Sequence, residues 1–235
     1  MYSFILKFQI ILKEKILVRM CVKERNIDKA FMNYLAHAFL SFNHPEILMG
    51  NMMGDFIKGK QIERYDLRIQ AGIKLHRSID HFTDAHELVL QAQHLLRPEF
   101  RISSGVFIDI FFDHFLANHP DYFPDNTLLP FTEKVYATIQ QQRGVLDDAM
   151  LTYFGYMEQY NWLFHYSTKE GIQRSVEGMC KRHPRLGNPV NAMSLFDEKY
   201  SNLQEHFNHF FPSLVEHAKN KLHELLPLSD GRSFE

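Results

Sequence analysis

Apolar residues recur along most of the chain at intervals of three and four, the spacing of one face of an α-helix. Strand-like alternation is nearly absent, and glycine and proline are sparse, at 11 and 9 residues. The pattern therefore predicts long helices with short connections. We expect helices at residues 33–42, 46–57, 66–82, 85–97, 104–118, 128–143, 147–161, 168–182, 191–210 and 213–225, with boundaries good to about two to four residues.

Residues that favour helix ends support several of these boundaries. Pro45 suits the first turn of a helix, and Pro212 is expected to separate the last two helices. Ser167 and Glu170 have the spacing of a capping box. With 235 residues and 45% apolar content the chain can bury a substantial core. We predict an all-α fold, a single-domain bundle of several helices.

The first 31 residues are apolar but interrupted. Lys7, Lys13, Glu14 and Lys15 divide them into runs too short for a signal-peptide core or for a membrane span of about 20 residues. No stable membrane insertion is expected, and the helical pattern of the rest begins at Met32. We predict an extension at 1–31, either a mis-assigned start or a dispensable amphipathic segment, a helical domain at 32–226 and a tail at 227–235.

Composition excludes several classes of function. A formal net charge of -2 and a pI near 6.7 argue against a protein that coats nucleic acid. Cys21 and Cys180 form neither a disulfide framework nor a cysteine zinc motif, which favours a reducing compartment and predicts the cytoplasm. The chain has no GxSxG elbow, Walker loop or HExxH motif, so the favoured nucleophile is a water activated by a metal.

Histidine and aspartate are concentrated in LHRSIDHFTDAH, residues 75–86. On a helix, His76, Asp80 and Asp84 form one row, because residues four apart share a face. The row lies beside an apolar stripe and therefore at the edge of the buried face. Carboxylate and imidazole groups held there suggest a metal site. For Asp84 the alternative is the N-cap of a helix that begins near Ala85.

A second stretch, VFIDIFFDHFLANH at residues 106–119, is apolar nearly all round, yet it contains Asp109, Asp113 and His114. An ionised carboxylate in such surroundings costs several kcal/mol unless it is paired or bound to a cation. A divalent metal would stabilise both carboxylates, and carboxylate with imidazole suits Mn²⁺, Mg²⁺ or Fe²⁺. For Asp109 the alternative is an ion pair with Arg77 or Arg101.

Two earlier stretches add one ligand-type residue each: MNYLAH contains His37, and GNMMGDF contains Asp55. Gly50 and Gly54 would let backbone or a ligand approach closely. For His37 the alternative is a hydrogen-bonded core histidine. For Asp55 the alternative is a helix-capping residue for the segment that follows it.

The ordered motifs MNYLAH, GNMMGDFIKG, AGIKLHRSIDHFTD and DIFFDHFLANH, followed by Trp162 and GMCKRHPRL, closely resemble those of the acyl carrier protein phosphodiesterases. The likeness extends from Met32 to about Leu222. That family is similar to the HD-type metal-dependent phosphohydrolases, all-helical enzymes whose histidines and aspartates bind a divalent cation. The resemblance implies an HD-like helical bundle that hydrolyses holo-acyl carrier protein to the apo form and 4'-phosphopantetheine, with manganese as the metal.

The resemblance also implies roles for single residues. Asp55 matches the aspartate on which the family depends for activity. One departure is Gly54, where a slightly larger small residue is expected; another is the extension at 1–31. The expected metal ligands are His37, Asp55, His76, Asp80 and Asp113, and the expected catalytic residues are Asp55, His76, Arg77 and His114.

The substrate protein would be acidic, and one segment suits it. Between Phe56 and Arg77, six basic residues oppose only Glu63 and Asp66 in a chain that is negative overall. That local excess favours docking of an acidic partner, although an ordinary solvated helix face is the alternative. KRHPR at 181–185 would form a second basic contact. The expected docking residues are Lys58, Lys60, Arg64, Arg68 and Lys74.

Arg77 is expected to bind phosphate charge, and His37, His76 or His114 to protonate the leaving oxygen. Two other functions stay open at this point. One is a phosphohydrolase of HD type acting on a nucleotide or another small phosphoester. The other is a non-catalytic module that binds carrier protein without cleaving it.

Overall fold

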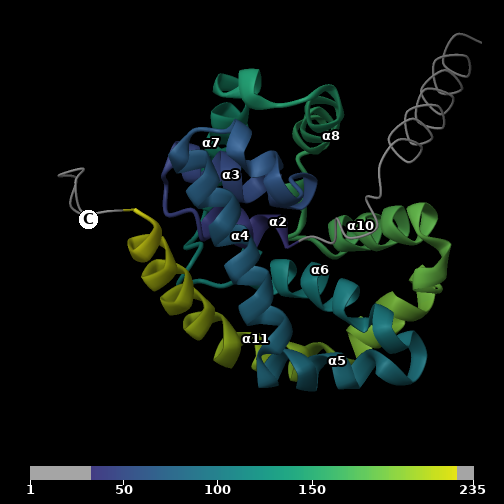
Figure 1. Cartoon of the computed structure of the whole chain (residues 1–235). Coiled ribbons are helices and arrows are strands. Elements are labelled where there is room, and N and C mark those ends of the chain that lie inside the picture. The colour runs from purple at the N-terminus through teal and green to yellow at the C-terminus, as the bar shows by residue number, and fades with distance from the viewer. Residues whose placement is uncertain (1–32, 227–235) are drawn as a thin grey trace, which may run out of the picture.

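The computed structural model describes residues 33–226, and within this range it contains helices and no strand (Figure 1). The predicted all-α fold is confirmed. The predicted extension at 1–31 and tail at 227–235 lie outside the described residues. None of the helices within 33–226 is both long enough and apolar enough to cross a membrane.

The α-helices follow one another along the chain with short 3-10 turns between several of them. The α-helices are α2 (Tyr34–Phe39), α3 (Pro45–Met53), α4 (Leu67–Ala85), α5 (Glu87–Phe100), α6 (Ser104–Ala117), α7 (Leu128–Gln141), α8 (Asp148–Gln159), α9 (Trp162–His165), α10 (Lys169–Arg182) and α11 (Pro189–Leu225). The 3-10 turns are η1 (Gly54–Phe56), η2 (Gly59–Arg64), η3 (Arg101–Ser103), η4 (Arg143–Val145) and η5 (Pro184–Leu186).

One hydrophobic core joins these helices. Helix α6 is buried on most of its surface, as its nearly continuous apolar sequence predicted. The long helix α11 packs against α4, α5, α6 and α10, and Figure 1 shows it curving along the lower edge of the molecule. Because a single apolar cluster contains side chains from nearly every helix, the bundle is one domain.

Two glycines allow α3 and α4 to pack with their backbones in contact. A Cβ atom on Gly50 would lie 2.1 Å from the carbonyl oxygen of Ile69, and one on Gly72 would lie 2.3 Å from that of Ile47. Any larger residue would separate the helices, so the predicted close approach of backbone at Gly50 is confirmed. This contact holds η1, the turn after α3, against α4.

The prediction that Pro212 separates two helices was wrong, because α11 continues through it. Proline in a helix interior removes one backbone hydrogen bond and costs about 3 kcal/mol. Phe207, Phe210, Phe211 and Leu214 continue the apolar stripe across this position, and all four are buried. Burial of that stripe offsets the cost, while Pro212 itself faces solvent.

Two predicted caps were also wrong. Thr168, not Ser167, caps α10, and its Oγ1 accepts from the backbone N–H of Gly171 at 3.1 Å. Asp84 does not begin a helix, because α4 continues to Ala85 and the ring of His86 caps α5. Asp84 therefore keeps its place in the row that begins at His76.

Candidate metal centre

Helices α2 and α4 bring His37, His76 and Asp80 together. One ligand atom from each lies within 4.8 Å of the other two. The two Nε2 atoms face the same carboxylate: His37 is 3.2 Å from Asp80 Oδ1, and His76 is 3.2 Å from Asp80 Oδ2. The imidazole rings stack with centroids 4.1 Å apart. Two imidazole nitrogens and a carboxylate that converge on one point are a donor set suited to a divalent cation.

Asp55 joins this cluster from η1. Its Oδ1 lies 3.4 Å from His76 Nε2. Gly54 makes this approach possible, because a Cβ atom there would lie 2.1 Å from Cγ of the His76 ring. Glycine at position 54 thus has a structural reason, since a Cβ atom there would overlap the ring.

Asn51 on α3 fixes the orientation of the His37 ring. Its side-chain nitrogen donates to the carbonyl oxygen of His37 at 2.8 Å, so its Oδ1 must be the atom 2.7 Å from His37 Nδ1. An amide oxygen only accepts, which places the proton of His37 on Nδ1 and leaves the Nε2 lone pair free when the ring is neutral. His37 is therefore buried and hydrogen-bonded, and it still presents a ligand atom to the cluster.

Solvent reaches the cluster on one side only. The side chains of His37 and His76 are 2% and 3% exposed, whereas that of Asp80 is 43% exposed. Burial acts to lower the pKa of His76, but hydrogen bonds and charge from Asp55 and Asp80 raise it to about 10. Burial acts to raise the pKa of Asp80, and its contacts with His37 and His76 lower it well below its usual value.

Asp109 on α6 faces the same group of carboxylates. Burial, followed by the negative charges of Asp80, Asp84, Asp113 and Asp55, raises its pKa well above the usual value. It does not pair with Arg77, whose Nη2 donates to the carbonyl oxygen of Ile57 at 2.9 Å. Nor does it pair with Arg101 or any other cation in residues 33–226. The sequence suggested either a metal or an ion pair for Asp109, and the ion pair with Arg77 or Arg101 is absent from the described residues, whereas the metal role stays untested.

Asp113, one helical turn further along α6, has a different environment. It is completely buried, and its carboxylate oxygens accept from the backbone N–H groups of Leu35 and Ala36, both at 2.9 Å. These are orphan donors at the N-terminus of α2. Burial raises the pKa of Asp113 to about 8 in spite of the two hydrogen bonds. The structure thus uses Asp113 to anchor the helix that carries His37, and the predicted metal role stays untested.

His114 has all its hydrogen bonds away from the cluster. Its Nδ1 donates to the carbonyl oxygen of Tyr166 at 2.7 Å, and its Nε2 lies 3.2 Å from the Tyr200 hydroxyl. Burial lowers its pKa. The predicted catalytic role stays a prediction, with no contact to His37, His76 or Asp80 within the described part of the chain to support it.

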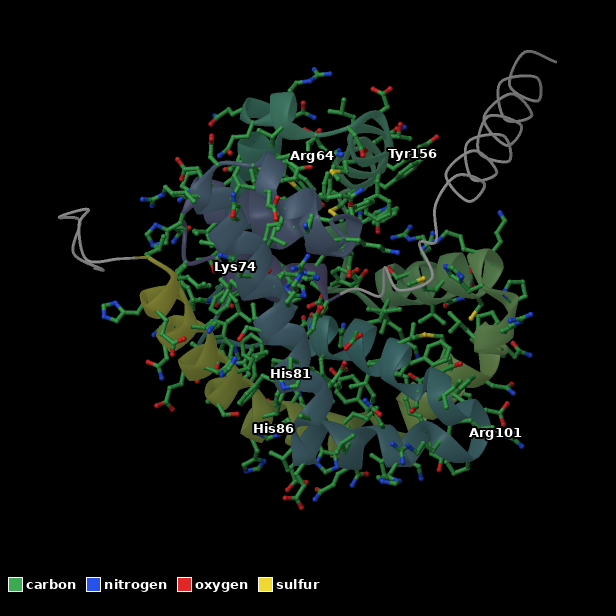
Figure 2. The ribbon with its side chains drawn as sticks, viewed as in Figure 1. Arg64, Lys74, His81, His86, Arg101 and Tyr156 are labelled. Carbon is green, nitrogen blue, oxygen red and sulfur yellow. The ribbon has the colours of Figure 1, made fainter. Side chains whose placement is uncertain are left out.

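The predicted docking residues lie on η2 and the first half of α4, which we call the basic surface. Arg68 forms an ion pair with Glu46 at 3.7 Å and is half-buried, whereas the other four are exposed. Figure 2 shows Lys74 on α4 and Arg64 toward the end of the molecule that contains α7 and α8. The basic surface adjoins η1 and α4, the two elements that position Asp55 and His76.

Comparison with known proteins gives a consistent set of relatives. Residues 32–214 match a family described as acyl carrier protein phosphodiesterase. A protein of that name from Photorhabdus laumondii is 32% identical over 197 residues, which is 83% of this chain and 100% of the relative. One from Klebsiella pneumoniae is 34% identical over 194 residues, 81% of this chain and 99% of the relative. No solved structure matches, so the likeness to the HD phosphohydrolase fold stays a prediction.

Proposed function

Because the chain belongs to the acyl carrier protein phosphodiesterase family, we propose that it hydrolyses holo-acyl carrier protein to the apo form and 4'-phosphopantetheine. One observation of the structure supports this most strongly. His37 comes from one motif of the matched region and His76 and Asp80 from another, and the three place their ligand atoms within 4.8 Å of one another. Asp55, the residue expected to be essential, is in contact with this cluster.

We propose that His37, His76 and Asp80 hold a divalent cation, with Asp55 and Asp109 as further oxygen donors. The carboxylates of Asp55, Asp80 and Asp109 repel one another, and a cation between them would remove that repulsion. Mixed imidazole and carboxylate donors favour Mn²⁺, with Mg²⁺ and Fe²⁺ as alternatives. A cation bound there would polarise a phosphoryl group and lower the pKa of a water molecule.

Protein side chains would supply the remaining functions. Asp80 is the most exposed member of the cluster, so substrate phosphate would enter on its side. Arg77 is exposed and lies one position after His76, where its guanidinium can bind phosphate oxygens once it leaves the Ile57 carbonyl. Asp55 can accept a proton from the attacking water. The leaving serine oxygen needs a proton, which none of the three proposed histidines is placed to give: Nε2 of His37 and of His76 would bind the cation, and His114 is bonded away from the cluster, so a water molecule would supply it.

The basic surface would receive the carrier protein. It presents Lys58, Lys60, Arg64 and Lys74 beside the cluster, and an acidic partner would be attracted to it. The cysteine content also leads us to propose a cytoplasmic location.

The docking proposal can be tested by charge reversal on the basic surface. The double substitution Arg64→Glu with Lys74→Glu should raise KM for carrier protein about tenfold at low salt. Arg101→Glu, at the opposite end of the molecule in Figure 2, is the matched control.

The direct test is the intact mass of holo-acyl carrier protein incubated with the enzyme and Mn²⁺. We expect loss of the phosphopantetheine mass, blocked by EDTA and by Asp80→Asn. Asp125→Asn, an exposed aspartate outside the cluster, should leave the reaction unchanged. An unchanged carrier mass would reject the proposal. Turnover of small phosphoesters under the same conditions would then favour a general phosphohydrolase, and tight carrier binding without cleavage would favour a binding module.

A further inference from the structure

A cavity of about 420 Å³ lies between α6, α9, α10 and the end of α8. Its volume is within the range of small-molecule sites, about 300–1,000 Å³. Its wall combines three aromatic side chains, Tyr160, Trp162 and Tyr166, with the guanidinium groups of Arg174 and Arg182. Such a wall provides flat apolar surface together with hydrogen-bond donors. It suits an organic ligand that has both methylene and carbonyl groups.

Two residues that line this cavity each contain a buried polar atom with no hydrogen-bond partner among residues 33–226. The atoms are Oδ1 of Asn161 and Nδ1 of His165. An unsatisfied buried polar atom costs about 1–3 kcal/mol, so proteins rarely keep one without a ligand or ordered water to satisfy it. Asn161 also has a left-handed backbone, with φ at 44°. An amide group, which both donates and accepts, is the chemistry that would satisfy the two atoms.

Two sets of residues connect the cavity with the region of the metal cluster. Ile110 lines it and directly follows Asp109 on α6, so the two side chains leave the helix about 100° apart. Trp162 packs on Tyr153 with ring centroids 5.6 Å apart, and Tyr153 packs on Phe56 at 5.4 Å. Phe56 follows Asp55. All three rings are only half-buried, so a ligand with its phosphate at the cluster would reach the cavity along their exposed sides.

We propose that this cavity receives the pantetheine arm of the carrier substrate, an inference that rests on the proposed function. From its phosphate the arm carries a hydroxyl with two methyl groups, then two amides, then a thiol. Its methyl and methylene groups would pack on the aromatic wall, and its amides would pair with Asn161 and His165. The arginines would donate to its carbonyl oxygens. The folded carrier would stay outside, on the basic surface.

Gly178 offers a substitution that fills the cavity with little risk to folding. It lines the cavity from the interior of α10, and a Cβ atom there would meet only the Arg182 side chain, at an ordinary 3.5 Å. Gly178→Leu should also favour the helix, because glycine is a poor helix former. Gly155→Leu on α8 is the matched control, since it is an equally helical glycine with no atom within 4 Å and no part in the cavity.

The fluorescence of Trp162 can report ligand binding to the cavity, because it is the one tryptophan of the chain. Pantetheine, without phosphate or carrier, should change Trp162 fluorescence with a Kd on the order of 1 mM. The change should persist in Gly155→Leu and be lost in Gly178→Leu. In the Mn²⁺-loaded enzymes, Gly178→Leu should lower kcat/KM for holo-carrier about tenfold, with Mn²⁺ affinity unchanged. Asn161→Gly, which tolerates positive φ, should lower it about threefold to tenfold.

Each outcome decides the proposal. Absence of a fluorescence change and of binding heat with pantetheine would overturn it, as would normal holo-carrier cleavage by Gly178→Leu. If inorganic phosphate alone reproduced the fluorescence change, the cavity would be an anion site at Arg174 and Arg182 instead. If the wild type cleaved no carrier, the proposed function would fail, while the pantetheine titration would still decide whether the cavity binds the arm.

Discussion

Two aspartates on α6, one helical turn apart, have opposite environments. Asp113 is fully buried and accepts two backbone hydrogen bonds from the N-terminus of α2. Asp109 has no hydrogen bond or ion pair within the described residues, and burial, followed by nearby carboxylates, raises its pKa. One carboxyl group is hydrogen-bonded within the fold, whereas for the other we propose a bound cation as the partner. The comparison shows that two carboxyl groups on the same helix can have different roles, one structural and one in ligand binding. Their hydrogen-bond partners distinguish the two roles.

The largest expected effect comes from Asp109→Asn. Loss of a residue that only hydrogen-bonds a metal ligand lowers activity by up to about 100-fold. If Asp109 itself binds the cation, loss of its charge should lower kcat/KM for holo-carrier by more than that. Stability without metal should stay constant or rise, because a repulsion is removed. Thermal unfolding in EDTA beside steady-state kinetics measures both. Full activity in Asp109→Asn would remove this residue from the site.

The next effect concerns Asn51, which holds His37 in its proposed ligand orientation. Asn51→Ala should weaken Mn²⁺ binding about 10- to 100-fold, the usual cost of losing such a partner. Ser41→Ala is a matched control: it removes the Ser41 hydrogen bonds to the His37 carbonyl oxygen, at 2.8 Å, and to the Asn51 side chain, at 3.0 Å, but leaves the Asn51 contact with the His37 ring in place. Calorimetric titration of Mn²⁺ compares the two variants. Equal affinities would show that Asn51 does not orient a metal ligand.

Asp113→Asn tests the structural role that we give to the second aspartate. The new amide nitrogen would face a backbone N–H of Leu35 or Ala36, leaving a buried donor unsatisfied at a cost of about 1–3 kcal/mol. Urea unfolding should show this loss of stability, while kcat per folded enzyme changes little. A variant of normal stability but without activity would reverse the roles that we give to Asp109 and Asp113.

The last prediction concerns the pH dependence of stability in the metal-free protein. The folded-state pKa of Asp113, about 8, is higher than its usual value of 3.8, so between these values the folded state binds the extra proton. Its contribution to stability is full below about pH 4 and is lost as pH rises through about 8. The slope cannot exceed about 1.4 kcal/mol per pH unit. Asp113→Asn should have a flatter profile between pH 5 and 8, and an identical profile would contradict this pKa.

Sequence reasoning found much of the site because local spacing determines it. His76 and Asp80 are four apart on one helix, and the structure places both against His37. A close approach at Gly54 was also predicted, although the helix was expected to continue to residue 57 and the neighbour that requires glycine, the ring of His76, was not visible. Helical periodicity therefore predicts which residues share a face.

The difference between Asp109 and Asp113 could not be read in the same way. Both lie on the same apolar helix, and their roles depend on where α2 begins, because Leu35 in its first turn contacts Asp113 across 78 residues of sequence. The same limit applied to Pro212, where burial of distant phenylalanines outweighs a local helix breaker. Tertiary packing, which spacing does not encode, decides these cases.

The central claim is best tested by the Mn²⁺ stoichiometry of three purified proteins: the wild type, Asp109→Asn and Asp113→Asn. Loss of the free Mn²⁺ electron paramagnetic resonance signal on titration measures bound metal directly. We predict one tightly bound Mn²⁺ per chain in the wild type and in Asp113→Asn, and at least about 100-fold weaker binding in Asp109→Asn. Normal binding in Asp109→Asn together with lost binding in Asp113→Asn would contradict the account.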